Sequence, residues 1–336
     1  MKKLSTRAFF VNTVPALLVL CSCSLAQAQS QAQSQGQDYP SRPITLVIPQ
    51  APGGGSDTIG RYIAEKLKDR LGQPIVSENR AGAAGMLGAA AVKRAPADGY
   101  TMLLGAIDTI ITPLVSKNPP IDGIADFVPV TLLTQSHNVW LVGPGFPGNS
   151  LKELVAAAKA NPGKIDYASS GFGSMQHLGG AMLNAQAGIE LTHVPYKGGP
   201  PAFADVIGGR VPAMISGFQG ALPQIKAGKV RGLAVTGKQR SAALPDLPTV
   251  SEALGLPDYE ALNWQGLFFP IGTPQPIVDR IAGEVKKILA EPETRDWLAS
   301  VGYEPVGNTP AEFAALIAAD YKRWSEIIKA ANIVSD

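Results

Sequence analysis

The sequence predicts an α/β fold of two doubly wound lobes joined by a two-strand hinge. Short β-branched apolar runs alternate with amphipathic helical patterns, and Gly-rich turns separate them. This alternation occurs twice, over 44–106 and over 150–236, and a chain of 336 residues is long enough for two lobes. Strands that are separated by helices are expected to run parallel.

The first set of segments begins at Tyr39. An apolar run over 44–49 is followed by a Gly-rich turn and a helical pattern over 57–71, which ends at Gly72. The other segments of this set are strands at 74–79 and 101–106 and a helix of small residues at 85–95.

The second set begins with a capping box. Ser150 and Glu153 stand at the first turn of a helical pattern that ends before Pro162. The strands predicted after it cover 165–169, 191–195, 211–216 and 231–236, and the helices cover 174–187 and 202–207.

The C-terminal part carries one strand near 264–270 and three helices, the last of which is capped by Thr309 and Glu312. These helices are expected over 276–290, 293–300 and 310–330. This part is expected to return to the first lobe, so that the chain crosses between the lobes near 134 and 236. The predicted division is lobe I at 39–133 and 237–336, and lobe II at 134–236.

The N-terminus has the features of a signal peptide over 1–28. Lys2, Lys3 and Arg7 precede an apolar run that is too short for a membrane anchor, and Ala26-Gln27-Ala28 supplies a cleavage site. Residues 29–38 are expected to form a flexible tether. The sequence therefore predicts export to the periplasm, with lipid attachment at Cys23 as the alternative.

Removal of the leader changes the formal net charge from +2 to 2 − 3 = −1, because 1–28 contains three basic residues and no acids. A near-neutral chain offers no basic surface for nucleic acid. Both cysteines, Cys21 and Cys23, also lie in the leader. We therefore predict no disulfide, thiol nucleophile or cysteine metal site for the mature chain, and no cofactor.

The loops that follow the predicted strands are rich in glycine and hydroxyl residues, above all at 51–57 and 169–174. Glycine exposes backbone N–H groups, and the first N–H groups of a helix have no partner within it. A carboxylate, whose oxygens only accept hydrogen bonds, suits such donors. Close helix–strand packing is the alternative reason for such turns, and capping is the alternative role of Asp57.

Nucleotide and catalytic sites are not predicted. The run 143–150 has Walker spacing but carries Asn149 where a phosphate-binding lysine is needed, and no G-x-S-x-G occurs. The histidines His137, His177 and His193 have no metal-ligand spacing. His177 is either a cavity residue or a packed one.

Short motifs along the whole mature chain carry a family resemblance. They are Pro52-Gly53-Gly54 with Ser56-Asp57, Glu78-Asn79-Arg80, Asp98-Gly99-Tyr100-Thr101, Gly173-Ser174 with His177-Leu178, Val194-Pro195-Tyr196-Lys197-Gly198, and Ala227-Gly228-Lys229. In this combination and order the chain resembles the Bug/TctC family, the extracytoplasmic solute receptors of tripartite tricarboxylate transporters.

The resemblance implies a type II periplasmic-binding-protein fold that closes on a carboxylate through main-chain N–H groups and hydroxyls. The sequence departs from the family pattern at Trp140 and at Ser216-Gly217-Phe218, where the family often has an acidic residue, and this suggests a bulkier or aromatic acid. The ligand-binding residues expected from the loops and the resemblance are Gly54, Gly55, Ser56, Asp57, Ser170, Gly171, Gly173, Ser174, His177, Tyr196 and Phe218.

The expected function is that of a monomeric periplasmic receptor, which binds a small di- or tricarboxylate or an aromatic carboxylate and hands it to membrane transporter subunits. One alternative is a receptor that presents its ligand to a sensor kinase. Another is an enzyme acting on a small acid, with His177 as base and Ser174 as nucleophile. No third group orients this histidine in a recognisable spacing, so we predict that the protein is not an enzyme.

Overall fold

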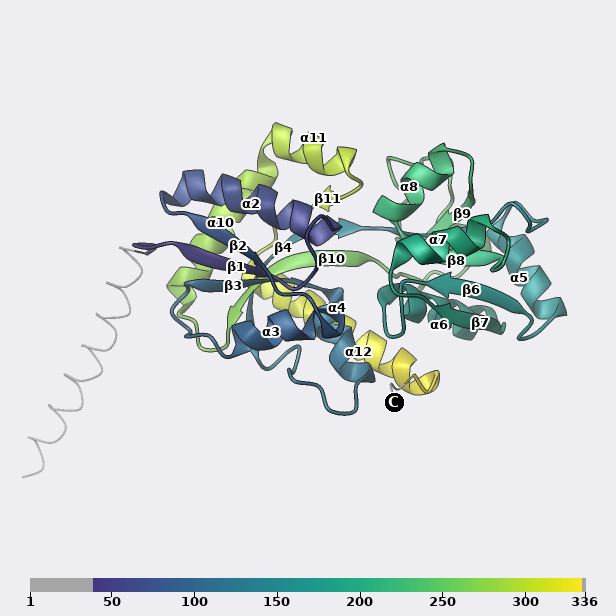
Figure 1. Cartoon of the computed structure of the whole chain (residues 1–336), viewed down its shortest axis with the longest axis horizontal. Coiled ribbons are helices and arrows are strands. Elements are labelled where there is room, and N and C mark those ends of the chain that lie inside the picture. The colour runs from purple at the N-terminus through teal and green to yellow at the C-terminus, as the bar shows by residue number, and fades with distance from the viewer. Residues whose placement is uncertain (1–38, 334–336) are drawn as a thin grey trace, which may run out of the picture. The chain divides into compact units, whose positions relative to one another are not determined.

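The computed structural model describes residues 39–333 (Figure 1). The signal peptide, the tether and Cys23 discussed above lie outside these residues. The segment that ends at Ser41 is a unit of its own, with a cis peptide bond between Tyr39 and Pro40. The compact unit that begins at Arg42 contains two β-sheets and the helices that cover them.

The first sheet has six strands in the order β11-β4-β10-β3-β1-β2. Strands β1, β2 and β3 run parallel as predicted, but β10 runs antiparallel to both β3 and β4. Strand β10 lies outside the two predicted sets of alternating strands and helices, and it enters the first sheet from the second. The strands are β1 (Ile44–Ile48), β2 (Ile75–Asn79), β3 (Thr101–Ala106), β4 (Phe127–Ser136), β10 (Asn263–Pro270) and β11 (Glu304–Pro305).

The second sheet has five strands in the order β7-β6-β8-β5-β9. Strand β6 is parallel to β7 and β8, whereas β5 is antiparallel to β8 and β9. Strand β5 comes directly from β4 with no helix between them, so the expectation for strands separated by helices does not apply to it. The strands are β5 (Asn138–Val142), β6 (Ile165–Ser169), β7 (Leu191–Pro195), β8 (Ala213–Gly217) and β9 (Arg231–Val235).

Helices cover both faces of each sheet (Figure 1). On the first sheet, α2 (Gly55–Leu71), α10 (Gln275–Ala290) and α11 (Pro292–Ser300) lie on one face. The other face carries η1 (Ala83–Gly85), α3 (Met86–Lys93), α4 (Ile107–Val115) and α12 (Pro310–Ala330). On the second sheet, α7 (Gly199–Ile207) and α8 (Phe218–Lys226) cover one face, and α5 (Leu151–Ala160), α6 (Met175–Ala187) and α9 (Val250–Leu254) cover the other.

Local sequence signals account for several helix ends. Gly72 ends α2 in the left-handed conformation, with φ 68°, which glycine adopts without steric cost. The predicted capping boxes of α5 and α12 are confirmed. Ser150 Oγ accepts the N–H of Glu153, and Thr309 Oγ1 accepts the N–H of Glu312.

Two crossing segments connect the sheets. The first lies between β4 and β5, at His137, and the second lies between β9 and β10. The segments are hydrogen-bonded to each other, because the N–H of Asn138 donates to Thr236 Oγ1 (2.9 Å) and the N–H of Thr236 donates to the Asn138 carbonyl (3.0 Å). These paired segments form the predicted two-strand hinge.

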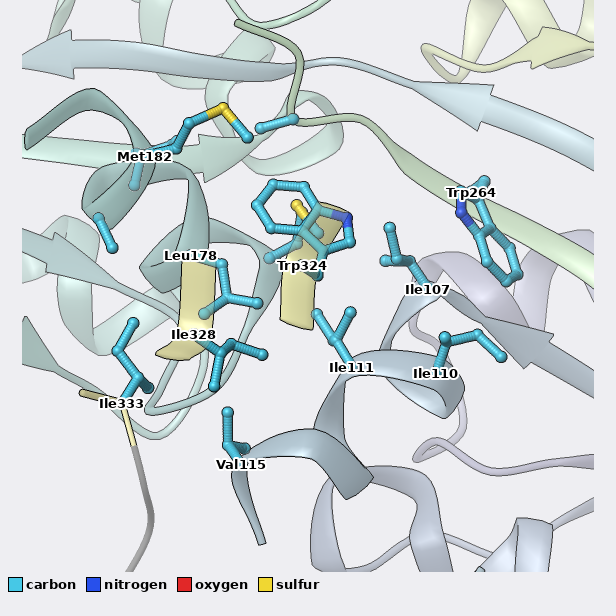
Figure 2. Close-up of a cluster of buried hydrophobic side chains, with 14 of the residues drawn as sticks. Ile107, Ile110, Ile111, Val115, Leu178, Met182, Trp264, Trp324, Ile328 and Ile333 are labelled. Atoms are coloured by element: carbon cyan, nitrogen blue, oxygen red, sulfur yellow. The ribbon is translucent and has the colours of Figure 1, made fainter. Parts of the chain in front are cut away.

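A hydrophobic cluster also joins elements of the two sheets (Figure 2). Ile107 and Ile111 of α4 belong to the same buried cluster as Leu178 of α6 and Trp324 of α12. Helix α12 contacts both α4 and α6. The connection between the sheets therefore includes a packed core in addition to the two crossing segments.

Candidate functional site

A cavity of about 810 Å³ is lined by elements of both sheets. The turns after β1, β3, β6 and β8 all reach it, as expected for the carboxyl ends of parallel strands. Helices α2, α4, α7 and α8 begin at its wall, where their unpaired N–H groups favour negative charge. Pro200, Phe203 and Ile207 of α7 add an apolar part to the wall.

The start of α2 contributes Gly55 and Ser56 to the cavity wall. Gly54 is the N-cap, so the N–H groups of these two residues have no carbonyl partner within the helix. Gly55 is packed closely, because a Cβ atom at this position would lie 2.3 Å from the Tyr303 hydroxyl oxygen. The predicted residues Gly55 and Ser56 are thus placed where their N–H groups can meet a ligand.

Asp57 lies behind this turn and does not line the cavity. Its carboxylate accepts hydrogen bonds from the N–H of Gly53 (2.9 Å), from Arg61 Nε (2.9 Å) and from Asn79 Nδ2 (2.8 Å). Burial raises the pKa of this carboxyl, but the three donors outweigh burial and hold the pKa at about 2. Asp57 therefore braces the turn from within the protein.

The Ser-Gly loop lies partly on the cavity. Ser170 lines it, whereas Gly171, Gly173 and Ser174 line an adjoining recess of about 360 Å³. Most donors of this loop are already bonded inside it: the N–H of Gly171 donates to Ser169 Oγ, and the N–H of Ser174 donates to the Gly171 carbonyl. The loop therefore offers fewer free donors than its composition suggests.

His177 lies in a second pocket of about 570 Å³, together with His193. Its Nδ1 accepts the N–H of Gly173 (3.1 Å). Burial lowers the pKa of His177 to about 4, and burial together with the nearby His177 lowers the pKa of His193 to about 3. Both imidazoles are therefore neutral at pH 7.

The proposed pairing of Ser174 with His177 in an enzyme finds no support in the geometry. Ser174 Oγ donates to the Gly171 carbonyl (2.7 Å) and accepts the backbone N–H of His177, not its imidazole. Ser169 Oγ does lie 2.6 Å from His193 Nε2, but this serine is fully buried and closed to a substrate.

Three aromatic residues discussed above lie away from the cavity wall. Tyr196 donates its hydroxyl hydrogen to Asp205 Oδ2 (2.7 Å). Phe218 is buried in the core under α7 and α8. Trp140 is fully buried and donates from Nε1 to the Tyr259 hydroxyl (3.1 Å). The suggestion of an aromatic ligand from Trp140 and Phe218 thus loses its basis.

Sequence reasoning missed the polar floor of the cavity. Ser136, Gln176, Asn263 and Gln265 line it. Asn138 orients two of them, because its Oδ1 accepts hydrogen bonds from Gln176 Nε2 and Asn263 Nδ2, both 2.8 Å long. No local motif marks these residues. The pairing of β4 with β10 brings Ser136, Asn263 and Gln265 together, and Gln176 reaches them from α6.

Two floor residues can donate to a ligand. One amide hydrogen of Gln265 already interacts with the Tyr303 hydroxyl, which leaves the second. Thr134 Oγ1 donates to Gln265 Oε1 (2.6 Å), which assigns the other end of this amide, Nε2, as a donor. Ser136 is 2% exposed, and its hydroxyl oxygen has no hydrogen-bond partner among residues 39–333. A buried polar group without a partner is costly, so a ligand that pairs with it is stabilised.

Asp108 is a second missed residue. It is half-buried at the start of α4, and it lines both the cavity and the adjoining recess. Burial raises the pKa of its carboxyl to about 6, although the nearby backbone N–H of Met175, at the start of α6, opposes this rise.

Other kinds of site are not found in the described part of the chain. Residues 39–333 contain no group of three or more His, Cys, Asp or Glu side chains that could hold a metal ion. None of the helices in this range is sufficiently long and apolar to cross a membrane. Gly143, Gly145 and Gly148 follow β5 in G-x-G-x-x-G spacing, but α5 begins only at Leu151, so these glycines do not open a helix as a dinucleotide site requires.

Comparison with known proteins identifies the family. A family model described as the tripartite tricarboxylate transporter family receptor matches residues 59–333. BugT of Bordetella pertussis is 34% identical over 293 residues, which cover 87% of this chain and 90% of BugT.

Two solved structures have a similar fold. An R. palustris protein with adipate has a TM-score of 0.79 and 35% identity, over 88% of this chain and 99% of that chain. MatC from Rhodopseudomonas palustris, with bound malate, has a TM-score of 0.74 and 32% identity, over 86% of this chain and 100% of MatC. The two-lobed fold is that of periplasmic binding proteins, as the sequence predicted. The chain belongs to the Bug/TctC family of tripartite tricarboxylate transporter receptors.

Proposed function

We propose that this protein is a periplasmic receptor that binds a small carboxylate in the 810 Å³ cavity and delivers it to a tripartite tricarboxylate-type transporter. One observation carries the proposal most directly. The start of α2 and Ser170, which the sequence predicted separately, line one cavity together with neutral donors of the floor. Relatives that contain adipate and malate support a carboxylate as the ligand.

The proposed contacts follow from the donors that remain free. The ligand carboxylate accepts hydrogen bonds from the N–H groups of Gly55 and Ser56 and from the side chains of Ser136 and Gln265. The Ser170 hydroxyl lines the cavity but already donates to Gln176 Oε1 (2.7 Å). Such neutral, fixed donors stabilise an anion without the larger desolvation cost of burying a cation. The apolar wall from α7 packs against the hydrocarbon part of the acid.

We further propose that the chain forms two lobes that close on the ligand. Lobe I comprises 39–133 and 237–336, and lobe II comprises 134–236. Export by the leader at 1–28 is part of the same proposal, because a receptor of this kind meets its ligand outside the cytoplasm.

Thermal unfolding of the mature protein with a ligand panel tests the binding. The panel contains succinate, adipate, citrate and benzoate, with putrescine and glucose as a cation and a neutral solute. A bound acid raises the unfolding temperature in a concentration-dependent way, because it binds only the folded state. A rise with putrescine or glucose but with none of the acids would refute the proposal.

A charge-changing pair of variants locates the binding site. Gln265→Glu places a carboxylate on the cavity floor and is expected to weaken acid binding at least about tenfold, because two buried anions repel. Gln275→Glu makes the same change on the exposed side of α10 and should leave affinity unchanged. Equal affinities of the two variants would place the ligand elsewhere.

Uptake separates delivery to a transporter from presentation to a kinase. Cells that lack the receptor gene are expected to lose uptake of the labelled acid, and the intact gene restores it. Normal uptake in the deletion strain would overturn the transport part of the proposal and leave the binding part in place.

A further inference from the structure

We infer that Asp108 selects acids that carry a hydrogen-bond donor, a hydroxyl or an ammonium group, in addition to the carboxylate. This inference rests on the proposed function and names the class of ligand for the same cavity. It makes Asp108 a specificity-determining residue, with the ligand's donor group placed against its carboxylate.

The first argument is the placement of the charge. Among the described residues that line the cavity, Asp108 is the one acid, and the one base is Lys229, which is exposed and follows α8. Asp108 forms no ion pair within residues 39–333; the salt bridges there involve other acids. A carboxylate without an ion pair among the described residues therefore lies on the wall of a cavity whose other described lining residues, apart from Lys229, are neutral.

The second argument is unused hydrogen-bonding capacity. A carboxylate has about four lone-pair sites for hydrogen bonds. Among residues 39–333, the backbone N–H of Met175 is the only neighbour that stabilises the Asp108 carboxylate, and burial still raises the pKa of this carboxyl to about 6. A ligand hydroxyl or ammonium group that donates to this carboxylate removes part of the desolvation cost.

A comparison with Asp57 separates this role from helix capping. Both acids lie in the first turn of a helix near the cavity. Asp57 is enclosed by three donors, which hold its pKa at about 2, and it faces away from the cavity. Asp108 lines the cavity and has no comparable set of donors. If the side chain at position 108 served only to accept the N–H of Met175, a neutral acceptor such as asparagine would be sufficient.

The cavity therefore has two unlike parts. Gly55, Ser136 and Gln265 offer donors for a carboxylate, and Asp108 offers an acceptor. An unsubstituted dicarboxylate has only acceptor oxygens, so a carboxylate of the ligand that approaches Asp108 is repelled, and its methylene groups have no hydrogen to donate to Asp108. An acid with a hydroxyl or ammonium group beside its carboxylate can pair with both parts at once.

Calorimetry on the mature protein tests this selectivity with succinate, malate and aspartate, which share one carbon skeleton. Wild-type protein is expected to bind malate or aspartate at least about tenfold more tightly than succinate, the usual effect of one hydrogen bond to a charged group. The malate and aspartate measurements distinguish a hydroxyl from an ammonium donor. Asp108→Asn keeps an acceptor for the Met175 N–H and is expected to reduce this preference to about threefold or less.

Asp296→Asn removes an exposed acid from α11 and serves as the matched control, with the wild-type preference retained. An unchanged preference in Asp108→Asn would overturn the inference. Equal binding of succinate and its substituted analogues by wild-type protein would also overturn it, even if the variant does not fold, and would leave the proposed function intact. Binding of none of these acids, nor of any acid in the wider panel, would overturn the proposed function itself.

Discussion

The imidazole rings of His177 and His193 are stacked, with centroids 3.8 Å apart and planes 10° from parallel. Their pKa values are about 4 and about 3, lowered mainly by burial, against 6.5 for a free histidine. Between those values the unfolded chain binds more protons than the folded chain. The free energy of unfolding is therefore expected to fall as pH drops from 6.5 toward 4.

His193→Gln removes one of these titrations. As pH falls over this range, the free energy of unfolding is expected to drop less steeply for the variant than for wild type. The two slopes should differ by up to about 1.4 kcal/mol per pH unit. Urea unfolding at pH 7.5, 5.5 and 4.5 measures the difference. Parallel curves of stability against pH for the two proteins would contradict the lowered pKa of His193.

Asp57 provides a second prediction, because its carboxylate holds the turn that presents Gly55 and Ser56. Asp57→Asn is expected to destabilise the fold by about 2 kcal/mol, since a buried acceptor for three donors is weakened. The variant should also bind the ligand acid more weakly. Asp69→Asn removes the same charge from the exposed side of α2 and is the control. Denaturant unfolding measures the free energy of unfolding of both variants. Equal values would mean that the Asp57 carboxylate does not stabilise the turn at Gly55 and Ser56.

Much of the fold follows from local patterns. The bounds of β3, β6 and β7 agree with those predicted, because each is an apolar run between clear turn residues. Strands β4 and β5 were missed because they follow each other with only His137 between them, so no helix marks their ends. Helices α4 and α8 have no clear helical pattern in the sequence, because Pro113 and Pro223 interrupt it.

The candidate site was less predictable than the fold. The turn at Gly55 and Ser56 and the loop at Ser170 were found because glycine and serine before a helix have a recognisable local signature. Gln265, Asn263 and Ser136 carry no such signature. They meet only because β10 inserts between β3 and β4, a pairing over a long distance in sequence that no local pattern specifies.

Close packing of Gly55 against Tyr303 gives a third prediction. Gly55→Ala places a Cβ atom 2.3 Å from the buried Tyr303 hydroxyl oxygen and is expected to cost about 1–3 kcal/mol. Tyr303→Phe removes that oxygen, and the next nearest atom lies 3.5 Å from the added Cβ. The double variant should therefore be more stable than Gly55→Ala alone. Gly283→Ala, in open space on α10, controls for helix propensity and should be neutral or stabilising.

The four unfolding free energies form a double-mutant cycle at positions 55 and 303. The expected result is that the double variant loses less unfolding free energy than the sum of the losses of the two single variants. Strictly additive losses would mean that the tyrosine moves aside without cost and that the contact does not fix the start of α2.

Trp324 gives the last prediction, because α12 joins the elements of the two sheets through this side chain. It is fully buried in one cluster with Ile111 of α4 and Leu178 of α6 (Figure 2). Trp324→Ala is expected to destabilise the protein by about 3–5 kcal/mol, since it leaves a large cavity in a closely packed core. The loss of a shared core should also separate unfolding of the second sheet from that of the first, which calorimetry would record as a broadened or split transition. Tyr321→Ala on the exposed side of α12 should change stability by less than about 0.5 kcal/mol. If both variants unfolded in one sharp transition at the same temperature, the cluster would not couple the lobes, and the two crossing segments at Asn138 and Thr236 would carry the connection alone.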